Sequence, residues 1–505
     1  MKLNRFLFIG LWVLQACSTS PSQNTSSTGS ESARSLCVSC HQYPEPGLLD
    51  KNTWQQFILP RMGYMYGIYP HDSTREDLFE KNPGRTHVER IGIFPSQPTV
   101  DQATWEEIYA FYIENAPQTL LLPSIQDSLG TLSSFEVEIP PTRMSPPSTT
   151  WIEIAGPGAI YLGDVHTETL YFLDETLTIQ RAAKVGHGAM TRWESKEALY
   201  IGVMGSFSPT DNPTGYVLEL PLQAAQRPRK VISRLQRPVS IAQADLDGDG
   251  LLDYVICEYA KWTGRLAWWK QKPDGSFQPK LLRNRPGAIE AFIQDWNQDG
   301  KQDIIALFGQ GDEGIFLYLN QGNGVFQESP LLRFPPSYGS SSLQLIDWDQ
   351  DGDSDIVYTA GDNADYLPVL KPYHGIRIFL NTDGTLEEYR FLPMHGAYGT
   401  AIRDFDKDGD LDIAAVSFFP DFTYDSTGGF RYFQNQGDDQ FKRFSIPEAS
   451  LGRWIVLDAG DVDGDGDEDI VLGSLAFEVT TPGTFVEDWV GRGIPFLLLK
   501  NKLFP

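Results

Sequence analysis

Three things are scarce in this 505-residue sequence: basic residues, cysteine and long apolar runs. The 40 lysines and arginines are outnumbered by 67 acidic residues, which leaves a formal net charge of −27. A surface of this sign repels phosphate backbones and attracts cations, so nucleic-acid binding is excluded. The apolar run near the amino terminus is shorter than the roughly 20 residues that a transmembrane helix requires, and no other segment comes closer.

The length and the apolar content indicate a folded chain with more than one unit. Hydrophobic residues make up 41% and aromatic residues 12% of the sequence, which argues against general disorder. A chain of 505 residues is too long for one ordinary core. We therefore expect at least two domains, or a repeat array.

Residues 1–16 have the features of a secretion signal: Lys2 and Arg5 supply positive charge around a short apolar run. Leu14-Gln15-Ala16-Cys17 resembles the bacterial lipobox, whose cysteine is acylated and becomes the first residue of the mature chain. The resemblance implies an exported cell-envelope protein, anchored by lipid at Cys17 to a membrane, which we expect to be the outer one, through a Ser-rich tether at residues 17–32. An ordinary signal peptide with a chance cysteine is the alternative.

The segment Cys37-Val38-Ser39-Cys40-His41 has the spacing of a c-type haem attachment site. Two thiols at this spacing can add to the two vinyl groups on one edge of the macrocycle, and the next residue places an imidazole under the iron. The pentapeptide predicts one covalent haem. A redox dithiol, a zinc half-site and a disulfide are the alternatives. However, no second cysteine pair exists for zinc, and no βαβ pattern surrounds the motif.

Residues 33–118 resemble a small, all-α cytochrome c domain. A helix is expected around residues 51–59, and a closing aromatic helix begins after Asp101 and carries Trp105, Ile108 and Tyr112 at helical spacing. The resemblance implies a sixth haem ligand, for which Met62 is the choice because the Pro-Arg-Met-Gly segment looks like a ligand loop. Met65, His71 and His87 remain open. Residues 119–132 are expected to be a linker.

Five segments share the pattern D-x-[DN]-x-D-G-x-x-D. Side-chain oxygens at positions 1, 3, 5 and 9 and a carbonyl near position 7 can surround one hard cation, and glycine at position 6 permits the sharp turn. The pattern predicts up to five calcium ions. The predicted ligands are Asp245, Asp247, Asp249 and Asp253; Asp295, Asn297, Asp299 and Asp303; Asp347, Asp349, Asp351 and Asp355; Asp404, Asp406, Asp408 and Asp412; and Asp461, Asp463, Asp465 and Asp469.

Each acidic loop is followed by an apolar run typical of a strand, where an EF-hand would continue as a helix. Successive loops begin 50, 52, 57 and 57 positions apart, which is the length of a four-stranded blade. Simple surface turns are the alternative, but five copies at fixed offsets argue against it. The arrangement resembles the FG-GAP or VCBS repeat family, which implies a calcium-binding β-propeller.

The period predicts a mainly β fold with seven blades over residues 133–505, preceded by the helical domain. Residues 151–186 and 187–238 are expected to form two blades that lack metal ligands. The last blade stops before its outer strand, so we predict that residues near 135–139 pair with residues near 496–500 and close the ring. Cys257, alone in a strand-like run, is expected to be a buried small hydrophobe.

Three functions are compatible with these features. The first is electron transfer by the haem domain to a redox partner protein, with the propeller as a rigid docking platform. The second is a dehydrogenase whose propeller passes electrons to the haem, although the propeller carries no paired cysteines or other quinone-site signature. The third is adhesion, or glycan or protein binding, through the propeller. The sequence favours a carrier or binding protein over an enzyme, and no catalytic residue is assigned.

Overall fold

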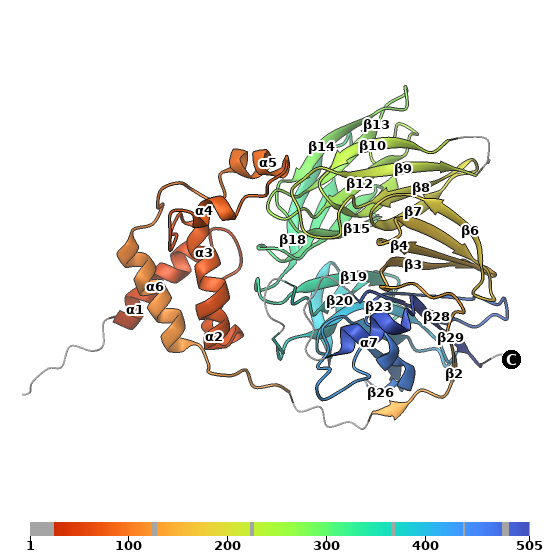
Figure 1. The fold of residues 1–505 in the computed structure, drawn as a ribbon. Helices are drawn as coiled ribbons and strands as arrows, with labels where there is room; N and C mark the ends of the chain where they lie inside the picture. The colour runs from red at the N-terminus through yellow and green to blue at the C-terminus, as the bar shows by residue number, and fades with distance from the viewer. Residues whose placement is uncertain are drawn as a thin grey trace, which may run out of the picture.

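The computed structural model describes residues 25–123, 129–222, 227–364, 369–437, 440–476 and 484–503. It shows a cluster of helices near the amino terminus beside a ring of sheets that holds most of the chain (Figure 1). The predicted signal peptide and Cys17 lie outside the described residues. Among the described helices, none is both long and apolar enough to cross a membrane.

The helical domain is organised by two helices that pack together, α1 (Thr25–Cys37) and α6 (Gln102–Asn115). The predicted cap is confirmed, because the Asp101 carboxylate accepts the Thr104 backbone N–H at 2.9 Å. The predicted tether is wrong for residues 25–32, which are helical. A side chain at Gly29 would lie 2.8 Å from the Glu107 carbonyl oxygen, so small residues let α1 approach α6 closely.

A second helical stretch runs further than predicted, through α2 (Lys51–Thr53), η2 (Trp54–Ile58) and α3 (Leu59–Met65). The segment η2 is a π-type turn that ends two residues before Pro60, which has no N–H to donate to the preceding turn. Met62 therefore lies in a helix, and the expectation of a ligand loop there is wrong. The remaining helical segments, which the sequence did not predict, are η1 (Pro46–Leu48), α4 (Thr74–Asp77) and α5 (Gly84–Ile91).

The ring consists of seven sheets, which we call blades 1 to 7 in chain order. Blades 1 and 2 comprise β3 (Thr149–Gly156), β4 (Ala159–Asp164), β5 (Thr169–Leu173) and β6 (Ile179–Lys184), then β7 (Ala189–Glu194), β8 (Ala198–Val203), β9 (Gly215–Pro221) and β10 (Arg229–Leu235). Blades 3 and 4 comprise β11 (Pro238–Ala244), β12 (Asp253–Glu258), β13 (Arg265–Gln271) and β14 (Phe277–Arg283), then β15 (Ala288–Gln294), β16 (Asp303–Phe308), β17 (Gly314–Asn320) and β18 (Phe326–Arg333).

Blades 5 and 6 comprise β19 (Ser340–Ile346), β20 (Asp355–Ala360), β21 (Gly375–Thr382) and β22 (Thr385–Pro393), then β23 (Ala397–Arg403), β24 (Asp412–Ser417), β25 (Phe430–Asn435) and β26 (Phe441–Ser445). Blade 7 comprises β27 (Trp454–Gly460), β28 (Asp469–Ser474) and β29 (Phe496–Asn501), with α7 (Phe485–Arg492) before its last strand and η3 (Pro447–Leu451) before its first. The predicted seven blades are confirmed, including the two without acidic loops.

The predicted closure of the ring is also confirmed. Strand β2 (Phe135–Glu138) pairs antiparallel with β29 and completes blade 7, from Phe135 opposite Asn501 to Glu138 opposite Leu498. The sequence did not predict β1 (Gly130–Thr131), which lies within the expected linker and adds a parallel fifth strand to blade 6. Both additions cover edges that would otherwise expose unpaired backbone groups.

The core lies between neighbouring blades. The second strand of each acidic-loop blade is buried at every position, for example β16 and β20. Clusters of buried apolar side chains then join one blade to the next, and Cys257 lies in one of them with no exposed surface. Because strands within a blade are antiparallel, the acidic loops between first and second strands share one face of the ring. The connections between second and third strands lie on the opposite face.

Candidate functional site

The segment from Cys37 to His41 forms a single turn at the end of α1. The Ser39 N–H donates to the Leu36 carbonyl at 3.2 Å, and the His41 N–H donates to the Cys37 carbonyl at 3.4 Å. Cys37 is half-buried, Cys40 is exposed, and both thiols are free. Two unpaired thiols on one turn, followed directly by an imidazole, form a donor set that fits covalent attachment of haem.

The surroundings of the turn argue against two of the alternative roles of the cysteines, a redox dithiol and a zinc half-site. Burial raises the pKa of Cys37, with Cys40 adding to the rise and a hydrogen bond from Tyr112 opposing it. Reactive dithiols need a lowered pKa. Within the described part of the chain, acidic, histidine and cysteine side chains converge as possible metal clusters only in the acidic loops. A zinc site at Cys37 and Cys40 therefore lacks further ligands.

Of the four candidate sixth ligands, Met62 is the one that packs in the apolar cluster containing Leu36 and Tyr43, which flank the turn from Cys37 to His41. Met65 belongs to a separate cluster nearer to the propeller. His71 is exposed, and the His87 ring lies 3.2 Å from the guanidinium of Arg90. The packing thus favours Met62, although it lies in a helix and not in a loop.

The turn faces the propeller. The Gln42 side-chain amide lies against the carbonyls of Arg333 and Phe334, and with its nitrogen turned toward them it donates to both, at 3.3 and 3.2 Å. Nearby, the Tyr373 hydroxyl donates to the Leu48 carbonyl at 2.9 Å. Burial lowers the pKa of His41, while the nearby Asp312 raises it and Arg333 lowers it. The imidazole is thus held in a site built partly by blade 4.

A second contact fixes the helical domain on the same face of the ring. The Glu80 carboxylate accepts the Thr210 hydroxyl at 3.0 Å and the Asp211 N–H at 3.1 Å. Phe94 packs edge-on against Trp262, with ring centroids 5.2 Å apart. Every propeller residue in the two contacts lies on or beside a connection of the face opposite the acidic loops. The predicted haem and the predicted calcium sites are therefore on opposite sides of the molecule.

The acidic loops bring together the carboxylates of positions 1, 3 and 5. In four loops these oxygens lie within 4.8 Å of one another, namely Asp245, Asp247 and Asp249; Asp347, Asp349 and Asp351; Asp404, Asp406 and Asp408; and Asp461, Asp463 and Asp465. The loop of blade 4 has Asn297 at position 3 and so offers one charge fewer. Convergent carboxylates with no cation between them repel, so this donor set fits a hard divalent ion such as calcium.

Glycine at position 6 and the residue at position 4 shape each loop. Every position-6 glycine has a positive φ, from 82° at Gly250 to 103° at Gly409, as the sequence predicts. Position 4 is also left-handed in all five loops, although it carries Gln298, Gln350 and Lys407 in three of them. The position-1 carboxylate holds the turn by accepting the position-6 N–H, for example at 2.7 Å from Gly300 to Asp295.

The aspartate at position 9 has a role that the sequence did not reveal. Asp303 is fully buried and accepts the Trp296 N–H at 3.0 Å and the Asn320 N–H at 2.7 Å, so it ties the acidic loop to the end of the third strand. Equivalent bonds are made by Asp253, Asp355 and Asp469. Asp412 accepts the Asn435 N–H at the end of the third strand and, as its other bond, the Tyr432 hydroxyl. The asparagine that recurs near the end of the third strand was the sequence feature from which this role could have been predicted. Coordination of a metal by these five carboxylates remains a prediction.

Electrostatics distinguish the loops from one another. Burial and the neighbouring Asp351 raise the pKa of Asp353 to about 6. Burial raises the pKa of Asp412 to about 7. In blade 3, by contrast, the Lys270 ammonium contacts Asp247 and lies 3.0 Å from Asp249, which places a built-in cation among the carboxylates. The blade 3 loop is therefore partly neutralised by the chain itself.

The chain is similar to one family of repeats and to several known proteins. An FG-GAP-like repeat matches residues 295–358. Cartilage acidic protein 1 of Mus musculus is 25% identical over 253 residues, which are 46% of this chain and 38% of that protein; its Homo sapiens counterpart is also 25% identical over 253 residues. The chain thus matches less than half the length of these curated relatives.

The chain is also similar to two solved structures. Virginiamycin B lyase from Staphylococcus aureus has a TM-score of 0.44 and 11% identity, covering 72% of this chain and 99% of its own. Hydrazine synthase of Kuenenia stuttgartiensis has a TM-score of 0.42 and 12% identity, covering 66% and 94%. The FG-GAP-like repeat and the seven-bladed ring together indicate a binding or adhesion module.

Proposed function

We propose that this chain is an exported electron-transfer protein, anchored by lipid at Cys17, with one covalent haem c and a calcium-binding propeller that serves as its docking module. One observation carries the proposal: the turn from Cys37 to His41, which has the sequence pattern of a haem-attachment site, lies against the face of the propeller. Its partner would be a redox protein or a surface ligand.

The haem, when bound, would supply one-electron exchange at its iron. The chain's own residues would hold this group: Cys37 and Cys40 would bind the macrocycle, and His41 and Met62 would be the iron ligands. Blade 4 contributes the carbonyls that fix Gln42 and the charged pair Asp312 and Arg333 near His41. Because His41 is partly buried, water would have limited access to its imidazole.

The direct test is a reduced pyridine haemochrome spectrum of protein made in a host competent for cytochrome c maturation. We expect a c-type band that stays with the protein after acid-acetone extraction and is lost in Cys37→Ala. With haem in place, Met62→Ala should lower the reduction potential and change the optical spectrum, because a thioether ligand is lost. Met65→Ala is the matched control. Equal effects of the two substitutions would remove Met62 as the ligand.

The calcium part of the proposal has a separate test. The acidic clusters should disfavour compaction without cations, so chelation should lower the melting temperature, and added calcium should restore it. The readout is calorimetry of the full chain with and without EDTA. An unchanged melting temperature would remove a stabilising role for calcium and leave the haem proposal untouched.

A second candidate is adhesion, or glycan or protein binding, by the propeller alone, and the FG-GAP-like repeat favours it. Absence of covalent haem in the extraction experiment would make it the leading function. Cys37 and Cys40 would then be a disulfide or a metal site, and the helical domain would be a structural attachment to the propeller.

A further inference from the structure

Four aromatic side chains form a continuous stack between the helical domain and the core of the propeller. The rings of Tyr373 and Tyr338 have centroids 4.6 Å apart and planes 12° apart. Next to Tyr338 lies Phe334, at 5.8 Å and 16°, and next to Phe334 lies Tyr358, at 4.1 Å and 13°. The four rings are therefore nearly parallel, and each contacts its neighbours at the distances of stacked aromatic pairs.

The outer end of the stack reaches the helical domain. The Tyr373 hydroxyl donates to the Leu48 carbonyl at 2.9 Å, and the Gln42 side-chain amide lies against the Phe334 carbonyl. Gln42 directly follows the turn from Cys37 to His41. The stack thus begins at the contact between the two domains, on the face of the ring opposite the acidic loops.

The inner end of the stack is a buried phenol that has a proton acceptor. Tyr358 has no exposed surface, and its hydroxyl oxygen lies 2.7 Å from the Ser340 hydroxyl oxygen. Ser340 uses its one hydroxyl proton to donate to the Glu313 carboxylate at 2.8 Å, so the Tyr358 hydroxyl donates to Ser340. Tyr358, Ser340 and Glu313 therefore form a line of short hydrogen bonds along which a proton can pass to a carboxylate.

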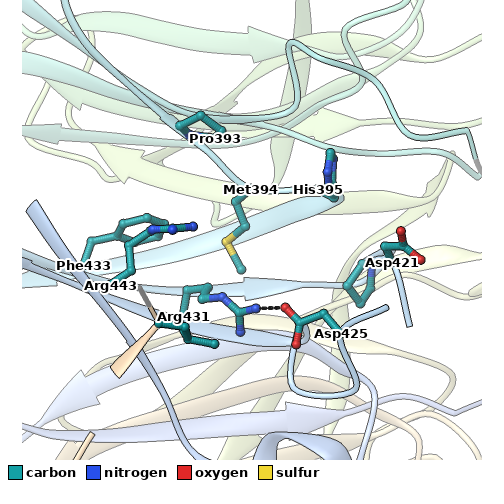
Figure 2. Close-up of a pocket in the computed structure, with 11 residues that line it drawn as sticks. Pro393, Met394, His395, Asp421, Asp425, Arg431, Phe433 and Arg443 are labelled. Carbon is teal, nitrogen blue, oxygen red and sulfur yellow. Dashed lines mark hydrogen bonds and ion pairs between the residues drawn. The ribbon is translucent and has the colours of Figure 1, made fainter. Parts of the chain in front are cut away.

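Glu313 differs from charged groups elsewhere on this face, because it has no cation as its partner. In the cavity of about 220 Å³ between blades 5 and 6, for example, Arg431 forms an ion pair with Asp425 (Figure 2). Glu313 instead accepts the Ser340 and Gly339 backbone N–H groups at 3.0 and 3.4 Å, and it forms no ion pair within the described part of the chain. Its carboxylate can therefore take up a proton without breaking an ion pair.

Burial decides how Tyr358 can be oxidised. A phenol that loses an electron and keeps its proton becomes a cation, and a cation without a partner is costly inside the propeller. Burial also raises the pKa of Tyr358 far above its usual value, so the hydroxyl keeps its proton until an electron leaves. The electron and the proton therefore need separate routes out of the ring, and the stack and the hydrogen-bonded line supply one each.

We propose that Tyr358 is a redox-active tyrosine that gives one electron to an oxidant at the helical domain. The electron passes along the other three rings of the stack. The Tyr358 O–H bond breaks as its proton moves to the Ser340 oxygen, and the Ser340 proton moves to Glu313. The products are a neutral tyrosyl radical, an intact serine hydroxyl and a carboxylic acid, and the co-reactant is a one-electron oxidant of high potential that is reduced by one electron. This activity goes beyond the function proposed above and does not require the haem.

A second buried tyrosine shows what the site requires. Tyr318 is only 1% exposed and lies in an apolar cluster, but its hydroxyl has no hydrogen-bond partner within the described part of the chain. A phenol without an acceptor cannot release its proton, so Tyr318 resists oxidation although it is as well buried as Tyr358. Tyr318→Phe is therefore the matched control for Tyr358→Phe.

The experiment oxidises the purified full chain with photogenerated tris(bipyridine)ruthenium(III) and detects tyrosyl radicals by electron paramagnetic resonance after freezing. Ascorbate added before freezing removes radicals from exposed tyrosines such as Tyr424, which is 90% exposed. The buffer is at about pH 8, because burial raises the pKa of Glu313 to about 7 and the carboxylate must be ionised to accept a proton. We expect a radical signal that survives ascorbate, is lost in Tyr358→Phe and is kept in Tyr318→Phe.

Further variants test the two routes separately. Glu313→Gln should slow formation of the surviving radical by about 100-fold or more, because the proton loses its acceptor. Phe334→Leu should also slow it, because the stack is interrupted. Phe379→Leu is the control for Phe334→Leu and should leave the rate unchanged, since Phe379 lies in the same apolar cluster but beside the stack, tilted by 45° against Phe334.

Three results would overturn the proposal. These are a sample in which no radical survives ascorbate, a surviving signal that is equally strong in Tyr358→Phe, or a rate of formation that is unchanged in Glu313→Gln or in Phe334→Leu. Circular dichroism and melting of the variants would separate a lost site from a lost fold. Light supplies the oxidant and the haem content of the same preparations is measured independently, so failure here leaves the electron-transfer proposal intact.

Discussion

Replacement of Phe135 by alanine tests whether β2 holds the ring closed. The side chain is 5% exposed and packs with Phe405 and Tyr432, with ring centroids 6.0 and 5.9 Å away. Truncation of a buried phenylalanine costs about 3–5 kcal/mol in the free energy of unfolding. Phe135 also lines a cavity of about 490 Å³ that water can enter, so relaxation is easy and we expect the lower end, about 3 kcal/mol.

The assay is urea denaturation of the calcium-saturated chain, followed by tryptophan fluorescence, together with hydrogen exchange of the amides in β29. Phe135→Ala should lower the urea midpoint and accelerate exchange in β29, because this strand then loses its outer neighbour. Glu136→Ala is the matched control, since Glu136 is exposed on the same strand and should change stability by less than about 0.5 kcal/mol. If the two variants behave alike, β2 does not close the ring energetically and the reasoning is refuted.

Three further predictions concern charge and docking. Lys270→Gln removes the built-in cation from the blade 3 loop, so calcium titration should gain affinity at one site, and an unchanged isotherm would contradict the competition. Burial raises the pKa of Glu313 from its usual value near 4.5 to about 7. The folded state then holds more protons than the unfolded state between these values, and the stabilisation present below about pH 4.5 is lost as pH rises through 7, by up to about 1.4 kcal/mol per pH unit. Glu313→Gln should flatten that slope in urea titrations, and a slope equal to that of the native chain would contradict it. Gly84→Ala would place a Cβ 2.7 Å from the backbone of Asp211 and should increase proteolysis between the domains, whereas Gly47→Ala, with open space around it, should not.

Much of the propeller could be predicted because its blades repeat. Each acidic loop comes directly before an apolar strand, and the spacing of 50 to 57 positions between loops gives the length of one blade, from which the number of blades follows. Closure was predictable for a different reason: the last blade lacked an outer strand, and the segment around Phe135 had a matching pattern. Strand β1 was missed because two residues carry no periodicity.

The helical domain was less predictable, because its features depend on contacts distant in sequence. Serine-rich composition around Gly29 suggested a tether, but the same small side chains allow close packing of α1 on α6. Met62 was chosen for its neighbours in sequence, which gave no sign that α3 continues past it to Met65. The docking of Gln42 and Glu80 on the propeller leaves no pattern in the sequence, since each contact needs only one carboxylate or amide.

The place of β2 in the fold has a consequence for how the molecule is made. Its partner β29 is synthesised more than 350 residues later, so blade 7 is the last to be completed, whatever the order of the other six. Until then the ring is an open arc whose two ends expose strand edges with unpaired backbone groups. In this state, copies of the chain can exchange strands with one another. The helical domain emerges first and contacts blades 2 to 5, so it can brace the arc while the final strand is still being made.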